Sequence, residues 1–181
     1  MGRRWAGLTV LAVVAAALAS AGGVGAAGGQ DRVSGAGAVT LSSQQTQGAP
    51  EHDQFSVGAT SDPDGSNPQG VVTDELSSPP GSPPTAFQGD VSQGCLIVHG
   101  NTAVAVGKLP ESEQTVIPGF GTVDYLAVTV VDNGNPDMGQ PTDQASAIFL
   151  FDRSAQRVCA QTLQLAVYPL DHGNFDVYDA S

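Results

Sequence analysis

Apolar and polar residues alternate with a period of two along much of this chain, which is the pattern of half-buried β-strands. Phe55, Val57 and Ala59 alternate with Ser56 and Gly58. We expect further strands at 122–132, 145–152, 162–168 and 174–178. Short strands separated by Gly, Pro, Asn and Asp turns are typical of sandwiches and barrels. The pattern therefore predicts an all-β fold, either an antiparallel β-sandwich or a partly closed barrel of about 7–9 strands.

The clearest element is a hairpin whose strands, 95–99 and 102–106, flank the turn dipeptide Gly100–Asn101. Such a dipeptide suits a two-residue hairpin loop. In the register that this turn sets, Ile97 lies opposite Val104, and both faces of the hairpin are apolar. A strand pair that is apolar on both faces belongs inside the sheet system rather than at a wet edge.

Two segments depart from the alternation. The stretch 77–84 contains four prolines, which lack the backbone N–H that a central strand needs, so we expect a loop there. Residues 152–163 place apolar side chains at the 3.6-residue period of a helix. For that segment a single helical turn and a non-helical connection are both open.

The N-terminal segment has the features of an export signal. The pair Arg3–Arg4 precedes an apolar run over 5–19, and small residues offer cleavage after Ala21 or after Ala26. The apolar run is short for a membrane-spanning helix, which needs roughly 20 residues. We therefore predict a signal peptide over 1–26, a secreted protein and no membrane span after cleavage, with Sec and twin-arginine export both open.

The length of 181 residues suits one domain, since domains average about 150 residues. After the signal, residues 27–52 are small and polar, and we expect either a flexible lead-in or a first strand there. Residues 53–181 then form a single all-β domain, interrupted by the proline-rich loop at 77–84.

The two cysteines, Cys95 and Cys159, are 64 positions apart in the part of the chain that follows the signal. An even number of cysteines in an exported protein predicts a disulfide. The alternative, a catalytic thiol, would need a cationic neighbour, and His99 is the nearest in sequence. We therefore expect a structural bridge, and a loop of this size contributes about 4 kcal/mol to stability.

The chain is acidic, with 6 Lys and Arg against 18 Asp and Glu and a net charge of −12. Only 13% of its residues are charged. This composition excludes a basic nucleic-acid binder and a coiled coil. An acidic surface also repels anionic membranes, so the expected partner is an extracellular protein or a cell-wall polymer.

Two loops are rich in oxygen ligands of the kind that calcium prefers. The first loop is not an EF-hand, because it has Asn67 where the calcium loop needs glycine. Asp and Asn also form Asx-turns without any metal, so turns are the competing interpretation. The predicted ligands are Asp62, Asp64 and Asn67 in the first loop and Asp132, Asn133 and Asp137 in the second.

Four segments of the chain follow one another in the order of a known family. They are 62–73, 89–101, 131–140 and 173–175. With these segments the chain resembles small secreted β-domains of high-GC Gram-positive bacteria that are sometimes labelled repetin-like. The resemblance implies an exported all-β domain, alone or beside others, and brings no catalytic residue. The proline-rich stretch at 77–84 departs from the family pattern.

Catalytic motifs do not occur in the sequence. His52, His99 and His172 are scattered, and neither H-E-x-x-H nor G-x-S-x-G is present. We therefore assign no catalytic residue and expect a non-enzymatic structural or interaction module at the cell surface or in the medium. Three alternatives are open: a calcium-stabilised adhesion or matrix-binding domain, an unrecognised secreted hydrolase with paired acids or a His beside an acid, and a barrel that holds a small apolar ligand.

Overall fold

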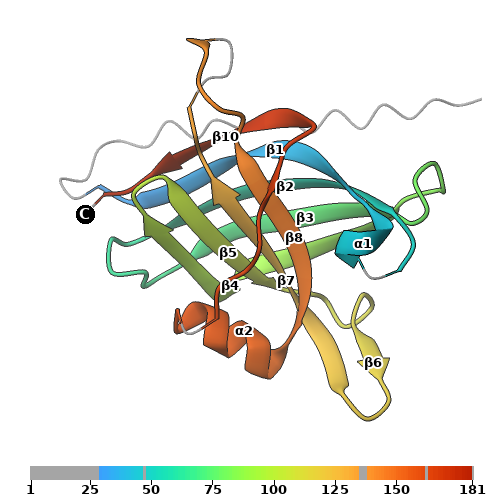
Figure 1. The fold of residues 1–181 in the computed structure, drawn as a ribbon. Coiled ribbons are helices and arrows are strands. Elements are labelled where there is room, and N and C mark those ends of the chain that lie inside the picture. The colour runs from blue at the N-terminus through green and yellow to red at the C-terminus, as the bar shows by residue number, and fades with distance from the viewer. Residues whose placement is uncertain (1–28, 47, 135–137, 162, 181) are drawn as a thin grey trace, which may run out of the picture.

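The computed structural model describes residues 29–46, 48–134, 138–161 and 163–180 (Figure 1). The predicted signal peptide at 1–26 and Asp137 lie outside the described residues. The strands are β1 (Asp31–Leu41), β2 (Glu51–Ser61), β3 (Gln69–Ser77), β4 (Thr85–His99), β5 (Thr102–Lys108), β6 (Thr115–Ile117), β7 (Gly121–Val131), β8 (Gln144–Phe151), β9 (Tyr168–Pro169) and β10 (His172–Tyr178). The helices are α1 (Ser43–Thr46) and α2 (Asp152–Cys159).

All the strands belong to one antiparallel sheet. Their order is β10-β1-β2-β3-β4-β5-β7-β8-β9, and β6 pairs with β7 outside this order. The sheet curls into a half-barrel, with β8 crossing in front of β2 and β3 in Figure 1. The predicted all-β class is confirmed, and of the two architectures the partly closed barrel forms.

The predicted hairpin is confirmed with its register. Ile97 pairs with Val104 and Leu96 with Ala105. The inward face of β4 and β5, including Leu96 and Val98, joins the main core inside the half-barrel. The outward face, including Val106, packs in a second cluster beneath α2. Two separate cores therefore explain why both faces of the hairpin are apolar.

Helix α2 is longer than the single turn that the sequence suggested. Its buried Ala155 and Val158 pack against Val106 and Leu150 on the outer face of the sheet. The Cys95–Cys159 disulfide, with the two Cα atoms 5.9 Å apart, joins the last residue of α2 to β4. The predicted bridge is thus present, and it fastens the helix to the sheet.

The strand predicted at 162–168 is wrong for the described residues 163–167. These residues cross the outer face of the sheet, and only Tyr168–Pro169 pairs, as β9. Leu163 and Leu165 pack on the second cluster. Their alternation with polar residues therefore reflects burial against the face of the sheet and not strand pairing within the sheet.

Within the predicted lead-in at 27–52, Asp31–Leu41 forms the strand β1. Strand β1 lies between β10 and β2, and its Val33 and Val39 are buried. Its weak alternation has a steric cause, since a Cβ at Gly35 would lie 2.3 Å from the backbone oxygen of Asn174. The proline-rich stretch forms the connection between β3 and β4, as expected. Within the described residues, no helix is long and apolar enough to cross a membrane.

Candidate functional site

A polar cleft lies beside an irregularity in the pairing of β4 with β5. The register shifts between the pairs Asp90–Lys108 and Cys95–Val106, so β4 contains a bulge over 91–94. Gly94 allows this path, because a Cβ there would meet the backbone oxygen of Val106 at 1.9 Å. Bulges of this kind often re-aim side chains next to binding sites.

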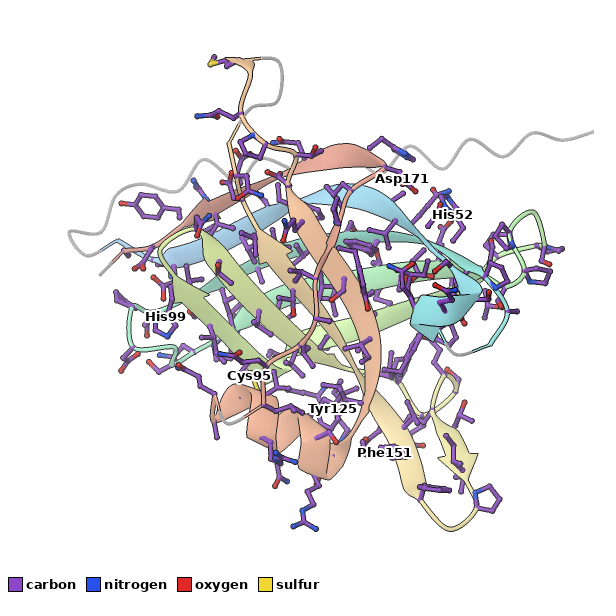
Figure 2. All side chains as sticks on the ribbon, in the orientation of Figure 1. His52, Cys95, His99, Tyr125, Phe151 and Asp171 are labelled. Carbon is purple, nitrogen blue, oxygen red and sulfur yellow. A yellow bond between two sulfur atoms is a disulfide. The ribbon has the colours of Figure 1, made fainter. Side chains whose placement is uncertain are left out.

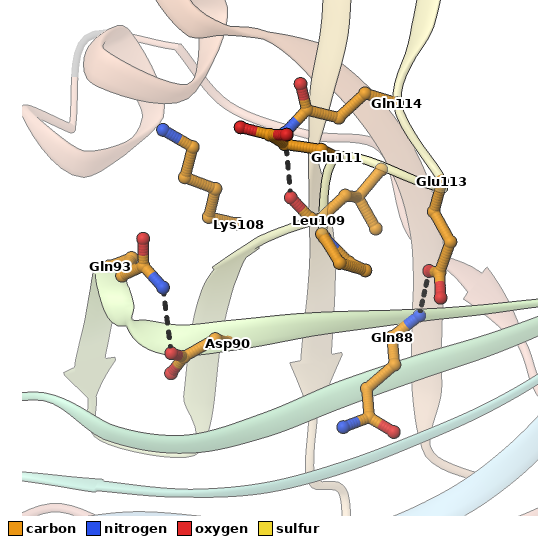
Figure 3. Close-up of a pocket in the computed structure, with 9 residues that line it drawn as sticks. Gln88, Asp90, Gln93, Lys108, Leu109, Glu111, Glu113 and Gln114 are labelled. Carbon is orange, nitrogen blue, oxygen red and sulfur yellow. Dashed lines mark hydrogen bonds between the residues drawn. The ribbon is translucent and has the colours of Figure 1, made fainter.

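The cleft has a volume of about 660 Å³. One wall comes from β4 with its bulge, and the other from the end of β5 and the following loop (Figure 3). The lining residues are Gln88, Asp90, Gln93, Lys108, Leu109, Pro110, Glu111, Glu113 and Gln114. Three amides, three carboxylates and one ammonium group therefore surround one space.

Hydrogen bonds hold four of the polar side chains of the cleft in place. Gln93 donates to Asp90 Oδ2 (3.0 Å), and the backbone N–H of Gln88 donates to Glu113 Oε2 (2.8 Å). Gln114 Nε2 donates to the backbone oxygen of Leu109 (2.9 Å). Hydrogen bonds from Gln93 and then from Ser92 lower the pKa of Asp90. Asp90 thus accepts hydrogen bonds from both Gln93 and Ser92.

A second group of titratable residues adjoins the cleft through Lys108. The Lys108 ammonium lies 5.8 Å from the centroid of the Tyr125 ring. Burial and then the nearby Asp152 carboxylate raise the pKa of Asp124. The buried Oδ1 of Asp124 has no hydrogen-bond partner among the residues that the structure describes. Burial first, and then Asp152 and Asp124, likewise raise the pKa of Tyr125.

Two further acids are buried inside the half-barrel. Asp53 on β2 is 4% exposed and Asp74 on β3 is 2% exposed. They are diagonal neighbours, since Asp53 pairs with Leu76 and Asp74 with Phe55. Neither acid lines the polar cleft. Sequence reasoning missed both, although each occupies an inward position of its strand.

A histidine, a hydroxyl and a carboxylate meet on the outer surface (Figure 2). The Thr40 hydroxyl donates to Asp171 Oδ2 (2.7 Å) and lies 3.1 Å from His52 Nδ1. All three groups are solvent-accessible, and none lines the polar cleft. His99 instead contacts Gln161 Oε1 (3.0 Å), so these histidines are surface hydrogen-bonding groups.

The first predicted calcium loop is held as a turn by its own hydrogen bonds. Asp62 Oδ2 accepts from Asn67 Nδ2 (2.7 Å) and from the Ser66 hydroxyl (3.2 Å). Asp64 Oδ1 accepts from the Ser66 N–H (2.9 Å). These are the contacts of an Asx-type turn.

The second predicted loop connects β7 to β8 and is hydrogen-bonded to the edge strand β10. Asp132 Oδ2 accepts from the Val177 N–H of β10 (3.1 Å), and the buried Asp143 accepts from Phe175 N–H (2.8 Å). Asn133 donates through its backbone to Asp143 Oδ1 (2.9 Å). Across the described ranges, no group of three or more His, Cys, Asp or Glu side chains is placed to hold a metal ion. Calcium binding stays an untested prediction.

Comparison with family models, curated proteins and solved structures finds no match to this chain. The repetin-like resemblance therefore stays a prediction that rests on the sequence segments alone.

Proposed function

We propose that the chain is an exported, non-enzymatic β-domain that binds a polar extracellular polymer in the cleft beside the β4 bulge. The observation that carries the proposal is the lining of this cleft by three amides, three carboxylates and Lys108. Amides and carboxylates fixed by hydrogen bonds are suited to hydroxyl and ammonium groups. A cell-wall glycan that bears amino groups has this chemistry.

Two observations support the location and the binding role. A disulfide joins Cys95 to Cys159, and structural disulfides persist mainly in oxidising compartments outside the cytoplasm. In the cleft, the lowered pKa of Asp90 suits hydrogen-bond acceptance better than proton transfer. The negative excess of the lining favours a neutral or cationic partner over an anionic one.

Titration calorimetry with a chitosan oligomer, and with a neutral glucan oligomer as comparison, tests this proposal. We expect the amino glycan to bind more tightly, and its affinity to fall with ionic strength because the lining carboxylates are solvent-exposed. Glu111→Gln removes one cleft charge and should weaken binding of the amino glycan about threefold to tenfold. Asp176→Asn makes the same charge change on the exposed face of β10 and should bind like the native chain. Equal affinities for the two variants would refute the cleft as the site.

A secreted hydrolase is a second candidate, favoured by Asp124. This residue has a raised pKa and lies beside Asp152, next to the cleft residue Lys108. Such a carboxyl group can act as a general acid when a second carboxylate is near. If the chain hydrolyses glycosidic bonds, Asp124→Asn should abolish release of reducing sugar while the oligomer still binds.

A further inference from the structure

The outer face of the sheet has one half that is packed and one half that is open. The second cluster covers this face with residues of β4, β5, β7, β8 and α2, together with Leu163 and Leu165. In Figure 1, α2 lies against that half and away from β1, β2 and β3. On the other half, Gln54, Glu75 and His172 are exposed. The outer face of β10, β1, β2 and β3 therefore meets solvent.

A groove of about 320 Å³ lies on the open half. We name it the β2 groove; residues of β10, β1, β2 and β3 line it. Gln54 and Ser56 stand on either side of the buried Phe55 in sequence, so their side chains point away from the core. Ala36 has a small side chain, which leaves space next to Ser56. The polar side chains of the groove are Gln54, Ser56, Thr73, Glu75 and His172.

The strand register joins the polar cleft to the β2 groove through a row of side chains. Gln88, which lines the cleft, pairs with Thr73, and Thr73 pairs with Ser56. Ser56 pairs in turn with Ala36, and Ala36 with Asn174. Directly paired residues of antiparallel strands share a face, so the row runs from one hollow into the other. Its four steps between neighbouring strands, of about 4.8 Å each, make it roughly 19 Å long.

The hydroxyl groups in the middle of the row are fixed and can still bind a ligand. Ser56 Oγ lies 2.7 Å from Thr73 Oγ1, and one hydroxyl donates to the other. The pair therefore keeps one O–H donor and several lone pairs for a ligand. Strands β1, β2 and β3 each pair with a neighbour on both sides, so this face offers side-chain groups and no free backbone edge. Such a surface suits a polymer rich in hydroxyl groups and not a peptide that pairs as an added strand.

Carboxylate groups lie at both hollows. Glu75 lines the β2 groove, and Glu111 and Glu113 are among the acids of the cleft. The paired Thr73 and Ser56 between the hollows carry no charge. A polymer that carries amino groups at intervals, with hydroxyl groups between them, complements this order of charged and neutral positions.

We infer that the amino glycan proposed for the cleft continues over the Gln88–Thr73–Ser56 row into the β2 groove as one extended chain. The inference rests on the proposed function, because the cleft is one end of the combined site. The glycan crosses the strands, with one amino group at the cleft carboxylates and another at Glu75. An oligomer that reaches both hollows makes contacts that a disaccharide in the cleft does not make.

Titration calorimetry with a chitosan disaccharide and a chitosan hexamer tests the extension. Ser56→Arg places bulk and positive charge in the groove, so hexamer affinity should fall at least about tenfold while the disaccharide binds as to the native chain. Gln69→Arg makes the same addition on the outer face of β3, four residues from Thr73, and should bind both oligomers like the native chain. Glu75→Gln replaces Ser56→Arg if the latter fails to fold by circular dichroism, and should weaken hexamer binding about threefold to tenfold.

The extension and the cleft fail in different ways in this experiment. A native chain that binds neither oligomer, or a Glu111→Gln variant that binds both as tightly as the native chain, refutes the cleft and the extension together. If binding depends on Glu111 but hexamer affinity is the same in Ser56→Arg and Gln69→Arg, the extension alone is refuted and the glycan ends in the cleft. A hexamer affinity that falls in Ser56→Arg, with the disaccharide unaffected, supports the combined site.

Discussion

At the residue scale, Asp53 and Asp74 occupy inward strand positions that their neighbours fill with apolar side chains. Burial first, and then the Glu51 carboxylate, raises the pKa of Asp53 to about 6. Burial first, and then the Asp53 carboxylate, raises the pKa of Asp74 to about 7. The buried Oδ1 of each has no hydrogen-bond partner within the described part of the chain. Ionising either acid in the folded protein is therefore costly.

This burial predicts that the protein loses stability as the pH rises from 4 to 8. The folded pKa values of about 6 and about 7 exceed the ordinary value of 3.8. The folded state thus holds protons that the unfolded chain releases, so the contribution is complete below about pH 4 and is lost as the pH passes the folded values. Asp74→Asn stays neutral, and at pH 8 it should raise the melting temperature by about 3–8 °C.

Thermal melting followed by circular dichroism from pH 4 to pH 8 checks this expectation. The Asp74→Asn and native curves should converge near pH 5, where the native carboxyl group is already neutral. Asp176→Asn, at an exposed position, should follow the native curve at every pH. A native melting temperature that rises between pH 5 and pH 8 would contradict the account of the buried pair.

The sequence predicted the pairing of the two cysteines and missed the buried pair of aspartates, for a physical reason. Cys95 and Cys159 are the only cysteines, so their pairing could be predicted from the expected export without any geometry. An aspartate in a strand pattern is normally taken as a turn or an outward position. Asp53 faces inward because the buried Phe55 lies two residues after it, and Asp74 because the buried Val72 lies two residues before it. Only the pairing register of β2 and β3 brings the two acids close to each other.

At the element scale, side chains take the place of a neighbouring strand along the outer edge of β10. The Asp143 carboxylate, 1% exposed, accepts backbone bonds from both Phe175 and Asn133. Asp132 likewise accepts a hydrogen bond from the backbone N–H of Val177, two residues further along β10. Carboxylates thus cover an edge that could otherwise pair with another chain.

Asp143→Asn should weaken the attachment of β10 to the β7–β8 connection, because the amide group of asparagine directs a donor toward one of the two backbone N–H groups. We expect a loss of about 1–3 kcal/mol in the free energy of unfolding. Hydrogen exchange measured by NMR should show faster exchange of the Phe175 amide, with the β2–β3 amides little changed. Asp176→Asn provides the matched control on the same strand, and equal exchange in the two variants would contradict a structural role for Asp143.

Helix α2 depends on the disulfide and on one small cluster. Ala155 and Val158 are its buried side chains, and Cys159 at its end bonds to β4. Replacing both cysteines with alanine should lower the free energy of unfolding by about 2–4 kcal/mol, given a separation of 64 residues. Urea denaturation measures the loss. An unchanged midpoint would show that the packing of α2 suffices without the bridge.

The elements that local chemistry specifies could be predicted, and those that packing specifies could not. The hairpin at 95–106 follows from a turn dipeptide and alternation, and its register is confirmed. Residues 163–167 alternate as a strand does, yet they cross a sheet face, which only the tertiary fold decides. The cleft likewise depends on a bulge at 91–94 that no local pattern marks.

At the scale of the whole molecule, an acidic chain is wrapped into a single open sheet. The full chain carries a net charge of −12, and the main core of its half-barrel is apolar. Repulsion among exposed carboxylates opposes both folding and self-association, and salt screens it over a Debye length of about 10 Å at 0.1 M. Stability should therefore increase with ionic strength, while binding of a cationic glycan should decrease.

Thermal melting in calcium chloride and in sodium chloride at equal ionic strength distinguishes charge screening from binding at a metal site. Asp62, Asp64 and Asp132 already accept hydrogen bonds that fix their loops, so the turn interpretation predicts screening alone. The melting temperature should then rise by the same few degrees in both salts and should not fall when EDTA replaces calcium. A calcium site would instead stabilise the folded state by mass action, with a shift that grows with calcium concentration at fixed ionic strength. A shift of that kind, lost in Asp62→Asn, would contradict the turn interpretation and favour the adhesion alternative.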